Sequence, residues 1–182
     1  MSNATVARLY DTYEAAAAVV RDLETAGVPA EDISIIANNA ADRATTIKHG
    51  NEAAPGAEIG AGVGALAGGG VGVLAGLGML AIPGVGPVVA AGWLVALAVG
   101  AAGGAAAGGL LGGLVGSGIS KEHAEVYAEG VRRGGTLVSA RVPAEQEGRI
   151  ASIMARNAVD PGARRLEYTT AGWTGYDPDR PI

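Results

Sequence analysis

Residues 59–120 read IGAGVGALAGGGVGVLAGLGMLAIPGVGPVVAAGWLVALAVGAAGGAAAGGLLGGLVGSGIS, and these 62 residues include no charged side chain. The stretch holds 21 of the 31 glycines of the chain. Small residues recur in its first part at every fourth position, at Gly60, Gly64, Gly68, Gly72 and Gly76. Residues at i and i+4 share one helix face, and glycine on that face lets two helix backbones approach closely. The first part of the stretch therefore predicts a helix with a contact groove.

The same spacing returns in the second part of the stretch. Its small residues are Gly92, Ala96, Gly100, Gly104, Gly108, Gly112 and Gly116. Between the two series, a hairpin turn is expected at Pro83, Gly84, Gly86 and Pro87. We therefore predict two helices, over residues 59–81 and 88–119. The first would be about 35 Å long, enough to cross a hydrocarbon core of about 30 Å, whereas the second, at about 48 Å, would have to tilt or bend.

The segment before the uncharged stretch has the pattern of a strand, a helix and a second strand. Residues 6–10 predict a short strand, and Asp11 with Glu14 favours a helix start. The helix is expected to end at about Gly27, and residues 32–37 predict the second strand.

The segment after the uncharged stretch continues the alternation. Ser120 is expected to cap a helix that ends at Gly134-Gly135, and residues 136–142 alternate as a strand. Pro143 is expected in the first turn of a further helix with Ile150, Ile153 and Met154 on its buried face, and residues 164–169 predict a last strand.

Neither flank would bury enough surface alone, so we expect one sheet domain built from both. The predicted fold class is α+β: a small split α/β sheet domain in the order β-α-β … α-β-α-β, ferredoxin-like, with the helical hairpin inserted. The predicted parts are 1–40 and 121–170 as the two halves of the domain, 41–58 as a polar linker, 59–120 as the hairpin and 171–182 as a loose tail. Both flanks would then lie on one side of any membrane.

An uncharged helical hairpin must be covered by lipid or by protein. The first hypothesis is a non-enzymatic protein of the cell inner membrane with both termini in the cytoplasm, whose hairpin inserts into the lipid bilayer and oligomerises through the grooves. The alternative is a cytoplasmic homo-oligomer, a soluble scaffold that buries the hairpins in its interior. Both hypotheses predict that the chain associates with itself.

Composition and motifs argue against several functional classes. A net charge of −5 without a basic cluster argues against nucleic acid as a partner, and the absence of Cys removes thiolate chemistry. The glycine-rich motifs lack the strand of a dinucleotide site and the Lys of a phosphate loop, and His49 and His123 have no metal-ligand set around them. The first ten residues do not form a secretory signal. We predict no catalytic residue, cofactor, metal or small-molecule substrate; a ligand-binding role would need a convergent polar pocket.

Residues 127–138, YAEGVRRGGTLV, resemble the carboxy-terminal half of a bacterial family of general, heat-induced stress proteins. Residues 6–38 are similar to that family's amino-terminal half, with an aspartate and an aromatic residue after the first strand, a helix ending in Ala26-Gly27-Val28, and Asp32-Ile33-Ser34-Ile35 following. A glycine-rich hydrophobic stretch between the halves is common in the family. The resemblance implies a stress-linked, membrane-associated small α/β domain, and it carries over no catalytic residue.

Overall fold

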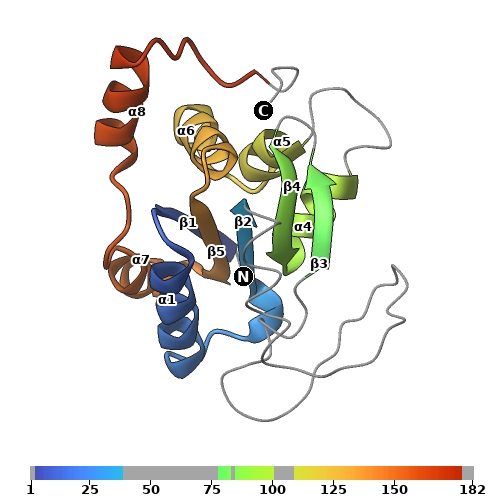
Figure 1. Ribbon diagram of the computed structural model, residues 1–182. Coiled ribbons are helices and arrows are strands. Elements are labelled where there is room, and N and C mark those ends of the chain that lie inside the picture. Colours follow the sequence, from blue (N-terminus) through green and yellow to red (C-terminus); the bar gives the residue numbers. More distant parts are fainter. Residues whose placement is uncertain (1–2, 39–77, 83–84, 101–108, 178–182) are drawn as a thin grey trace.

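The computed structural model describes residues 3–38, 78–82, 85–100 and 109–177, and these form a mixed α+β fold around one antiparallel sheet (Figure 1). The sheet has five strands in the order β1-β5-β2-β4-β3. The strands are β1 (Asn3–Tyr10), β2 (Ile33–Asn38), β3 (Gly78–Ile82), β4 (Gly86–Ala91) and β5 (Thr136–Pro143).

The two flanks of the chain share this sheet, as the sequence predicts. β5 lies between β1 and β2 and is antiparallel to both, with Val6 opposite Ala140 and Ile35 opposite Val138. The strands predicted near residues 6–10, 32–37 and 136–142 are therefore confirmed as β1, β2 and β5. β1 and β2 of the first flank are joined only through β5 of the second, so neither flank forms this part of the sheet by itself.

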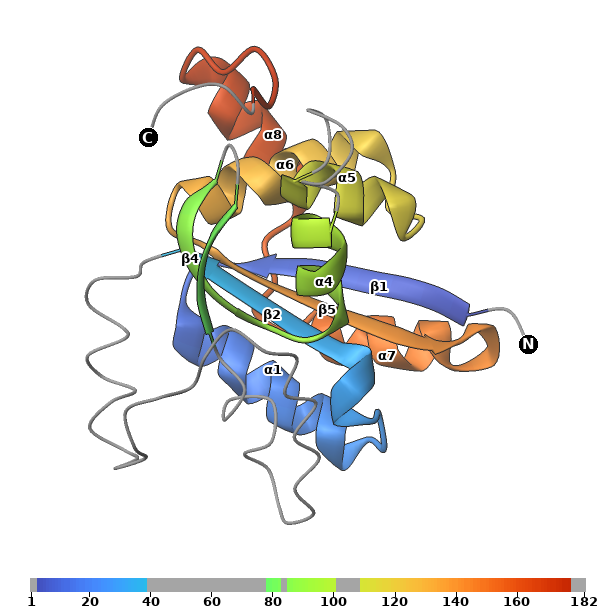
Figure 2. The same cartoon turned by 90° about the vertical axis from the view of Figure 1, so that its right-hand side faces the viewer.

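Two helices cover one face of the sheet: α1 (Tyr13–Thr25) and α7 (Glu147–Met154) (Figure 2). The apolar side chains of this face include Leu23 of α1 and Ile150 of α7, both fully buried. In β5, Val138, Ala140 and Val142 belong to this core, whereas Leu137 belongs to the opposite one, so the predicted alternation of the strand is confirmed.

The start of α1 differs from the prediction. Thr12, not Asp11, is the N-cap, and its side chain accepts a hydrogen bond of 3.2 Å from the backbone N–H of Ala15. Asp11 is instead paired with Arg164, at 2.7 Å. A distant partner thus takes the carboxylate that a local capping interaction would have used.

The opposite face of the sheet is covered by α4 (Trp93–Gly100), α5 (Gly109–Gly116) and α6 (Lys121–Arg132) (Figure 2). Ser120 caps α6, as predicted, and its side chain accepts from the N–H of His123. Tyr127 packs in this core and donates a hydrogen bond of 3.2 Å to the carbonyl oxygen of Ala7 in β1. α6 is thereby held directly over the edge strand.

The predicted helical hairpin is wrong at residues 78–82 and 86–91, although α4 and α5 lie within its second predicted helix, residues 88–119. Residues 78–82 and 86–91 are strands β3 and β4, paired with Leu80 opposite Val88, and a helix begins only at Trp93. β4 extends the sheet at β2, where Ile36 lies opposite Ala90. The β-branched pair Val88-Val89 suits a strand, and the free edge of β2 supplies a partner for it.

The expected hairpin turn connects two strands, whereas the sequence predicted that it would connect two helices. The chain reverses between Ile82 and Gly86, so it connects two strands, and Gly86 and Pro87 belong to β4. Pro83 and Gly84 lie outside the described residues, as does most of the first predicted helix, residues 59–77.

The last predicted strand, at residues 164–169, is also wrong, because these residues belong to helix α8 (Pro161–Thr170). Asp160 caps this helix by accepting a 2.7 Å hydrogen bond from the N–H of Ala163, and Pro161 occupies the first turn, where its missing N–H costs nothing. α8 packs on the outer side of α6 (Figure 1).

The predicted loose tail is ordered at its beginning. Trp173 is only 3% exposed and packs with Val126 of α6 and Tyr168 of α8. Residues 171–177 therefore add to the layer that α8 forms over α6, and residues 178–182 lie outside the described part of the chain.

Candidate functional site

The predicted helix-contact residues fall in several parts of the chain. Gly60, Gly64, Gly68, Gly72, Gly76, Gly104 and Gly108 lie outside the described residues. Ala96 and Gly100 belong to α4, Gly112 and Gly116 belong to α5, and these two helices contact each other. A Cβ atom added at Gly116 would meet no atom within 4 Å, so no described helix packs against that position.

Gly92 has a different role from the predicted one. It lies in the bend before α4 with a φ of +98°, and a Cβ atom there would overlap the carbonyl oxygen of Ile33 and lie 2.6 Å from the Cα of Ser34. The hydroxyl of Ser34 donates a 2.8 Å hydrogen bond to the carbonyl oxygen of Ala91. Gly92 therefore allows the chain to pass directly against β2. It does not serve the predicted contact between two helices.

A second contact fixes the start of α4 to the domain. The indole N–H of Trp93 donates a 3.1 Å hydrogen bond to the carbonyl oxygen of Asp32, and the guanidinium of Arg141 lies 4.7 Å from the centre of the Trp93 ring. Arg141 also pairs with the Asp32 carboxylate at 3.0 Å. These contacts anchor the second part of the uncharged stretch to β5 and to the turn before β2.

α4 and α5 have eight residues each, about 12 Å of helix. Within the ranges that the structure describes, no helix combines the length and the apolar character needed to cross a membrane.

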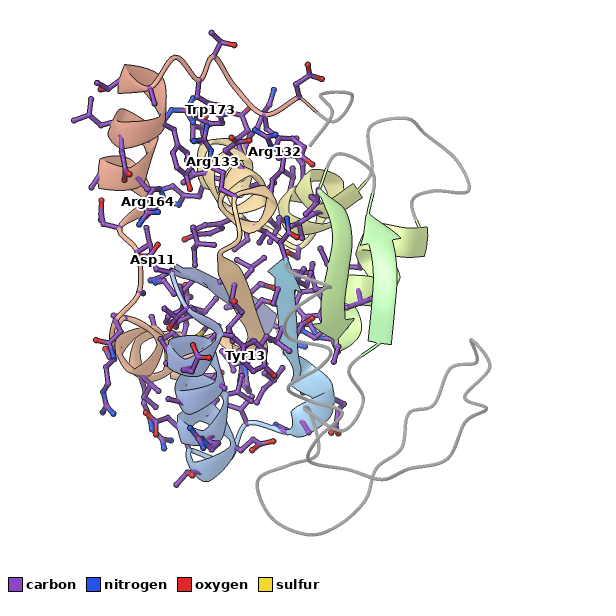
Figure 3. All side chains as sticks on the ribbon, viewed as in Figure 1. Asp11, Tyr13, Arg132, Arg133, Arg164 and Trp173 are labelled. Atoms are coloured by element: carbon purple, nitrogen blue, oxygen red, sulfur yellow. The ribbon has the colours of Figure 1, made fainter. Side chains whose placement is uncertain are left out.

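A polar pocket of about 220 Å³ opens where the end of β1, the C-terminal end of α6 and the helix α8 meet. Its polar side chains are Asp11, Arg133, Arg164, Glu167 and Tyr168. Figure 3 shows that Asp11, Arg133 and Arg164 come from three separate parts of the chain that converge here.

Glycines form part of the pocket wall. A Cβ atom at Gly130 would overlap the Leu9 side chain, and one at Gly135 would lie 2.9 Å from the carbonyl oxygen of Gly130. These two glycines therefore let α6 and its final turn lie close to β1. Gly134, with a φ of +101°, differs because a Cβ atom there would meet nothing within 4 Å. The expected helix stop at Gly134-Gly135 is confirmed, and it also leaves open space beside the arginines.

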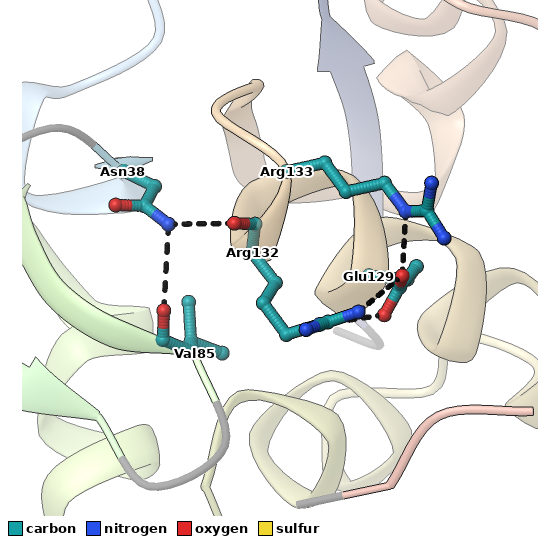
Figure 4. Close-up of polar contacts among 5 residues, drawn as sticks. All are labelled: Asn38, Val85, Glu129, Arg132 and Arg133. Atoms are coloured by element: carbon teal, nitrogen blue, oxygen red, sulfur yellow. Dashed lines mark hydrogen bonds and ion pairs between the residues drawn. The ribbon is translucent and has the colours of Figure 1, made fainter. Parts of the chain in front are cut away.

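A buried carboxylate organises the cluster beside the pocket (Figure 4). Glu129 is 1% exposed, and its two oxygens accept hydrogen bonds of 2.7 and 2.8 Å from Arg132 and one of 2.5 Å from Arg133. Burial raises the pKa of Glu129, but the hydrogen bonds and charges of the two arginines outweigh it and lower the pKa overall. Glu129 is thus an ionised acceptor shared by two guanidinium groups.

The two arginines use this carboxylate differently. Arg132 binds it with two nitrogens, and its backbone carbonyl accepts a 2.9 Å hydrogen bond from the side-chain amide of Asn38 (Figure 4). The same amide also donates to the carbonyl oxygen of Val85, at 3.4 Å, which ties α6 to β2 and to the start of β4. Arg133 uses only its Nε, and among the described residues its two terminal nitrogens have no hydrogen-bond acceptor.

An aromatic side chain holds the plane of the Arg133 guanidinium. Its central carbon lies 4.4 Å from the centre of the Tyr168 ring, which is 4% exposed and makes an edge contact with Trp173 at 5.8 Å between ring centres. Burial raises the pKa of Tyr168, so the ring stays neutral at physiological pH. Arg133 is therefore oriented from two sides, by Glu129 and by Tyr168.

Arg164 forms the other cationic part of the pocket. It pairs with Asp11 at 2.7 Å and with Glu167 at 3.2 Å. The side chains of these two acids are 65% and 68% exposed, so they lie at the rim of the pocket, whereas that of Arg164 is 22% exposed. Two arginines and two carboxylates thus balance each other in charge around the pocket.

The cationic side chains of this pocket are suited to an anionic group. The pocket contains no nucleophile beside a base, and nowhere among the described residues do three or more His, Cys, Asp or Glu gather as a metal site. Oriented guanidinium groups are suited to bind phosphate or carboxylate groups. Sequence reasoning missed this pocket; the one local signal was Arg132-Arg133 before two glycines, inside the segment that carries the stress-protein resemblance.

Comparisons of the chain with protein-family models, with curated proteins and with solved structures give no match in any of the three.

Proposed function

We propose that this chain is a non-enzymatic, stress-associated protein that attaches to the inner membrane from the cytoplasmic side through residues 59–77 and associates with itself there. The proposal rests on one observation: both ends of the region that contains this uncharged segment lead into the same sheet, at β2 and at β3. Other residues of the uncharged stretch have a different role, since Leu94, Leu110 and Leu114 are fully buried in the domain.

The length of the segment decides how it would enter lipid. A bilayer-spanning hairpin needs about 40 apolar residues, about 20 for each crossing. Residues 59–77 supply 19 uncharged residues, and the residues before them carry charges. Because β2 and β3 lie in one sheet, both ends of the segment stay on one side of the membrane. We therefore propose insertion from one side, without crossing, in place of the two-helix span.

A second candidate is a homo-oligomer that buries residues 59–77 between subunits. The observation in its favour is that protein already covers other apolar residues of the uncharged stretch: Val85, Val88 and Leu94 are completely buried against the sheet and its helices. The five glycines at every fourth position in residues 59–77 suit close packing in either environment.

The strand order supports a more specific proposal about the fold. β1 and β2 are joined through α1 and separated by β5, an arrangement found in split β-α-β units such as the ferredoxin-like fold. We propose that this unit is the scaffold that presents residues 59–77, with β3 and β4 added beside β2.

The absence of Cys from the chain allows a clean test of both candidates. A single cysteine is placed in the segment by Leu74→Cys, or at the exposed position Thr174 by Thr174→Cys as a control. Each variant is treated with a membrane-impermeant maleimide, with and without vesicles of bacterial lipid composition. Protection of position 74 only when vesicles are present supports membrane attachment, and the control should react in both conditions.

Protection of position 74 without vesicles, together with an oligomer in crosslinking, would favour the second candidate. Equal reaction of the two variants in every condition would overturn both. Oligomer size in Gly68→Leu then tests the groove, because a larger side chain should separate the packed backbones and lower the crosslinked fraction.

A further inference from the structure

We propose that the pocket between β1, α6 and α8 binds a phosphate group, with Arg133 as the principal ligand. This inference goes beyond the proposed membrane attachment and does not depend on it. The phosphate group can belong to a small organic phosphate or to a lipid headgroup, and the experiment below separates these two sources.

Arg133 has donors to offer. A guanidinium carries five N–H donors, and Arg133 gives only its Nε to Glu129. The remaining nitrogens have no acceptor in the described part of the chain, and the side chain is 39% exposed at the pocket. The two terminal nitrogens of Arg133 can therefore donate hydrogen bonds to two oxygens of one phosphate.

The guanidinium of Arg133 is also held in place before any ligand arrives. Glu129 fixes its Nε from the buried side, and the Tyr168 ring fixes its plane at 4.4 Å. Both of these partners are less than 5% exposed. Less conformational freedom is lost on binding when the ligating side chain is already oriented.

The pocket has room for the ligand because glycines form part of its wall. Gly134 faces open space, and Gly130 and Gly135 bring the backbone close to β1 without adding side chains to the pocket. A volume of about 220 Å³ corresponds to about seven water molecules of liquid, which is enough for a phosphate and a short organic group.

The two carboxylates at the rim of the pocket affect how strongly a phosphate can bind. Asp11 and Glu167 neutralise Arg164, so an incoming phosphate must compete with them for that guanidinium. Asp11 is the closer competitor, at 2.7 Å, but it is largely exposed and therefore weakly held. The geometry thus predicts that removing the Asp11 charge strengthens phosphate binding, whereas removing Arg133 weakens it.

The experiment measures binding of glycerol 3-phosphate to the full-length protein by calorimetry at low salt. We expect Arg133→Gln to weaken binding about tenfold or more, as for the loss of a charge-assisted hydrogen bond, and Asp11→Asn to strengthen it severalfold. Arg133→Lys keeps the charge but loses the planar pair of donors, so it should also bind more weakly. Arg156→Gln is the matched control, because Arg156, in the turn after α7, pairs with Asp22 of α1 on the exposed surface, and neither residue lines the pocket.

Circular dichroism and the thermal midpoint show that each variant is folded. No binding by the wild-type protein, or equal binding by wild type and Arg133→Gln, would overturn the proposal, as would weaker binding by Asp11→Asn.

A second arm replaces the soluble phosphate by vesicles with and without phosphatidic acid. Loss of the phosphatidic-acid preference in Arg133→Gln assigns the lipid headgroup, and its persistence assigns the soluble phosphate. Vesicle attachment through residues 59–77 can fail or succeed independently of the calorimetric result.

Discussion

Two neighbouring regions on the same side of the sheet are held together by opposite kinds of interaction. α4 and α5 are fixed by apolar contact, with Leu94, Leu110 and Leu114 fully buried against the sheet. α8 is fixed to α6 by charged and aromatic contacts, such as Arg165 with Glu125 at 3.4 Å and Arg165 over the Trp173 ring at 5.3 Å.

The difference has a functional meaning. Apolar packing depends little on pH, so the contacts of α4 and α5 should persist where ionic contacts weaken. The contacts between α6 and α8 respond to charge, and the pocket lies among them. Substitutions in the charged layer should therefore leave the apolar layer intact.

The largest effect is expected in the apolar layer. Leu114→Ala should lower the free energy of unfolding by about 2 to 5 kcal/mol, because it leaves a cavity at a fully buried position. Val115→Ala, at a neighbouring position that is 43% exposed, should change it by less than about 0.5 kcal/mol. Denaturant unfolding of both variants measures the difference. Equal losses would mean that α5 does not pack on the sheet as described.

The next effect concerns the passage of the chain past β2. Gly92→Ala and Gly118→Ala both place a side chain at a positive φ, which costs about 1 to 2 kcal/mol in each case. Only at Gly92 would the new Cβ also overlap the β2 backbone, which should cost about 1 to 3 kcal/mol more. Thermal unfolding of the two variants isolates this additional term, and an identical midpoint shift would contradict the close approach.

A smaller and pH-dependent effect is expected in the charged layer. Glu129→Gln should lower the free energy of unfolding by about 1 to 3 kcal/mol at pH 7, because Arg132 and Arg133 lose a charged acceptor. The pKa of Glu129 is lowered by folding, so the unfolded chain binds the proton more readily. The stabilisation is therefore present above the ordinary pKa of 4.5 and is lost as the pH falls through the lower folded pKa.

Denaturant unfolding from pH 7 downward tests this sign. The difference between wild type and Glu129→Gln should shrink as the pH falls, and a difference that grows would contradict the ion cluster. Glu122→Gln, at an exposed position of α6, serves as the control and should stay within about 0.5 kcal/mol of wild type at pH 7.

The smallest effect is expected at Arg141, which has both an ionic contact, with Asp32, and an aromatic contact, with Trp93. Arg141→Gln removes a partly exposed ion pair with Asp32 and the stacking on Trp93, together worth about 0.5 to 1 kcal/mol. Arg141→Lys should recover part of this loss through its charge alone. Salt should reduce the gap between wild type and Arg141→Gln, and a gap unchanged at high salt would assign the whole contribution to packing.

The parts of the fold that the sequence predicted are those whose apolar residues recur with the period of a strand or a helix. In β5, the alternation places Val138 on one face and Leu137 on the other, and in α6 the helix period brings Ala124, Tyr127 and Val131 together. Caps and stops at Ser120, Gly27 and Gly134 then fixed the ends of these elements.

Residues 78–82 and 86–91 of the uncharged stretch were mispredicted for a physical reason. β4 is apolar along its whole length, so Val88-Val89-Ala90-Ala91 shows no polar side from which a period of 2 or 3.6 could be read. Spacing of small residues suggested a helix, but Gly92 is small because β2 passes beside it. In α8, the start signal Asp160-Pro161 was present and outweighed the strand-like pattern that followed.

The pocket could not have been predicted from local patterns. Asp11 and Arg164 are 153 positions apart in the chain, and Arg133 comes from a third element. The separate residues resemble ordinary surface charges, and only the packing of α8 on α6 brings them together.

The pairing of β1 with β5 has a consequence for how the protein is made. Asn3 lies opposite Pro143 and Tyr10 opposite Thr136, so β1 has no neighbour in the sheet until β5 has been synthesised. β2 cannot replace it, because β5 separates the two in the finished sheet. Throughout that delay, 62 consecutive uncharged residues are newly synthesised without a completed core to receive them. Folding of the sheet therefore cannot be completed before β5 has been made, and we expect the uncharged residues to be prone to aggregation until then.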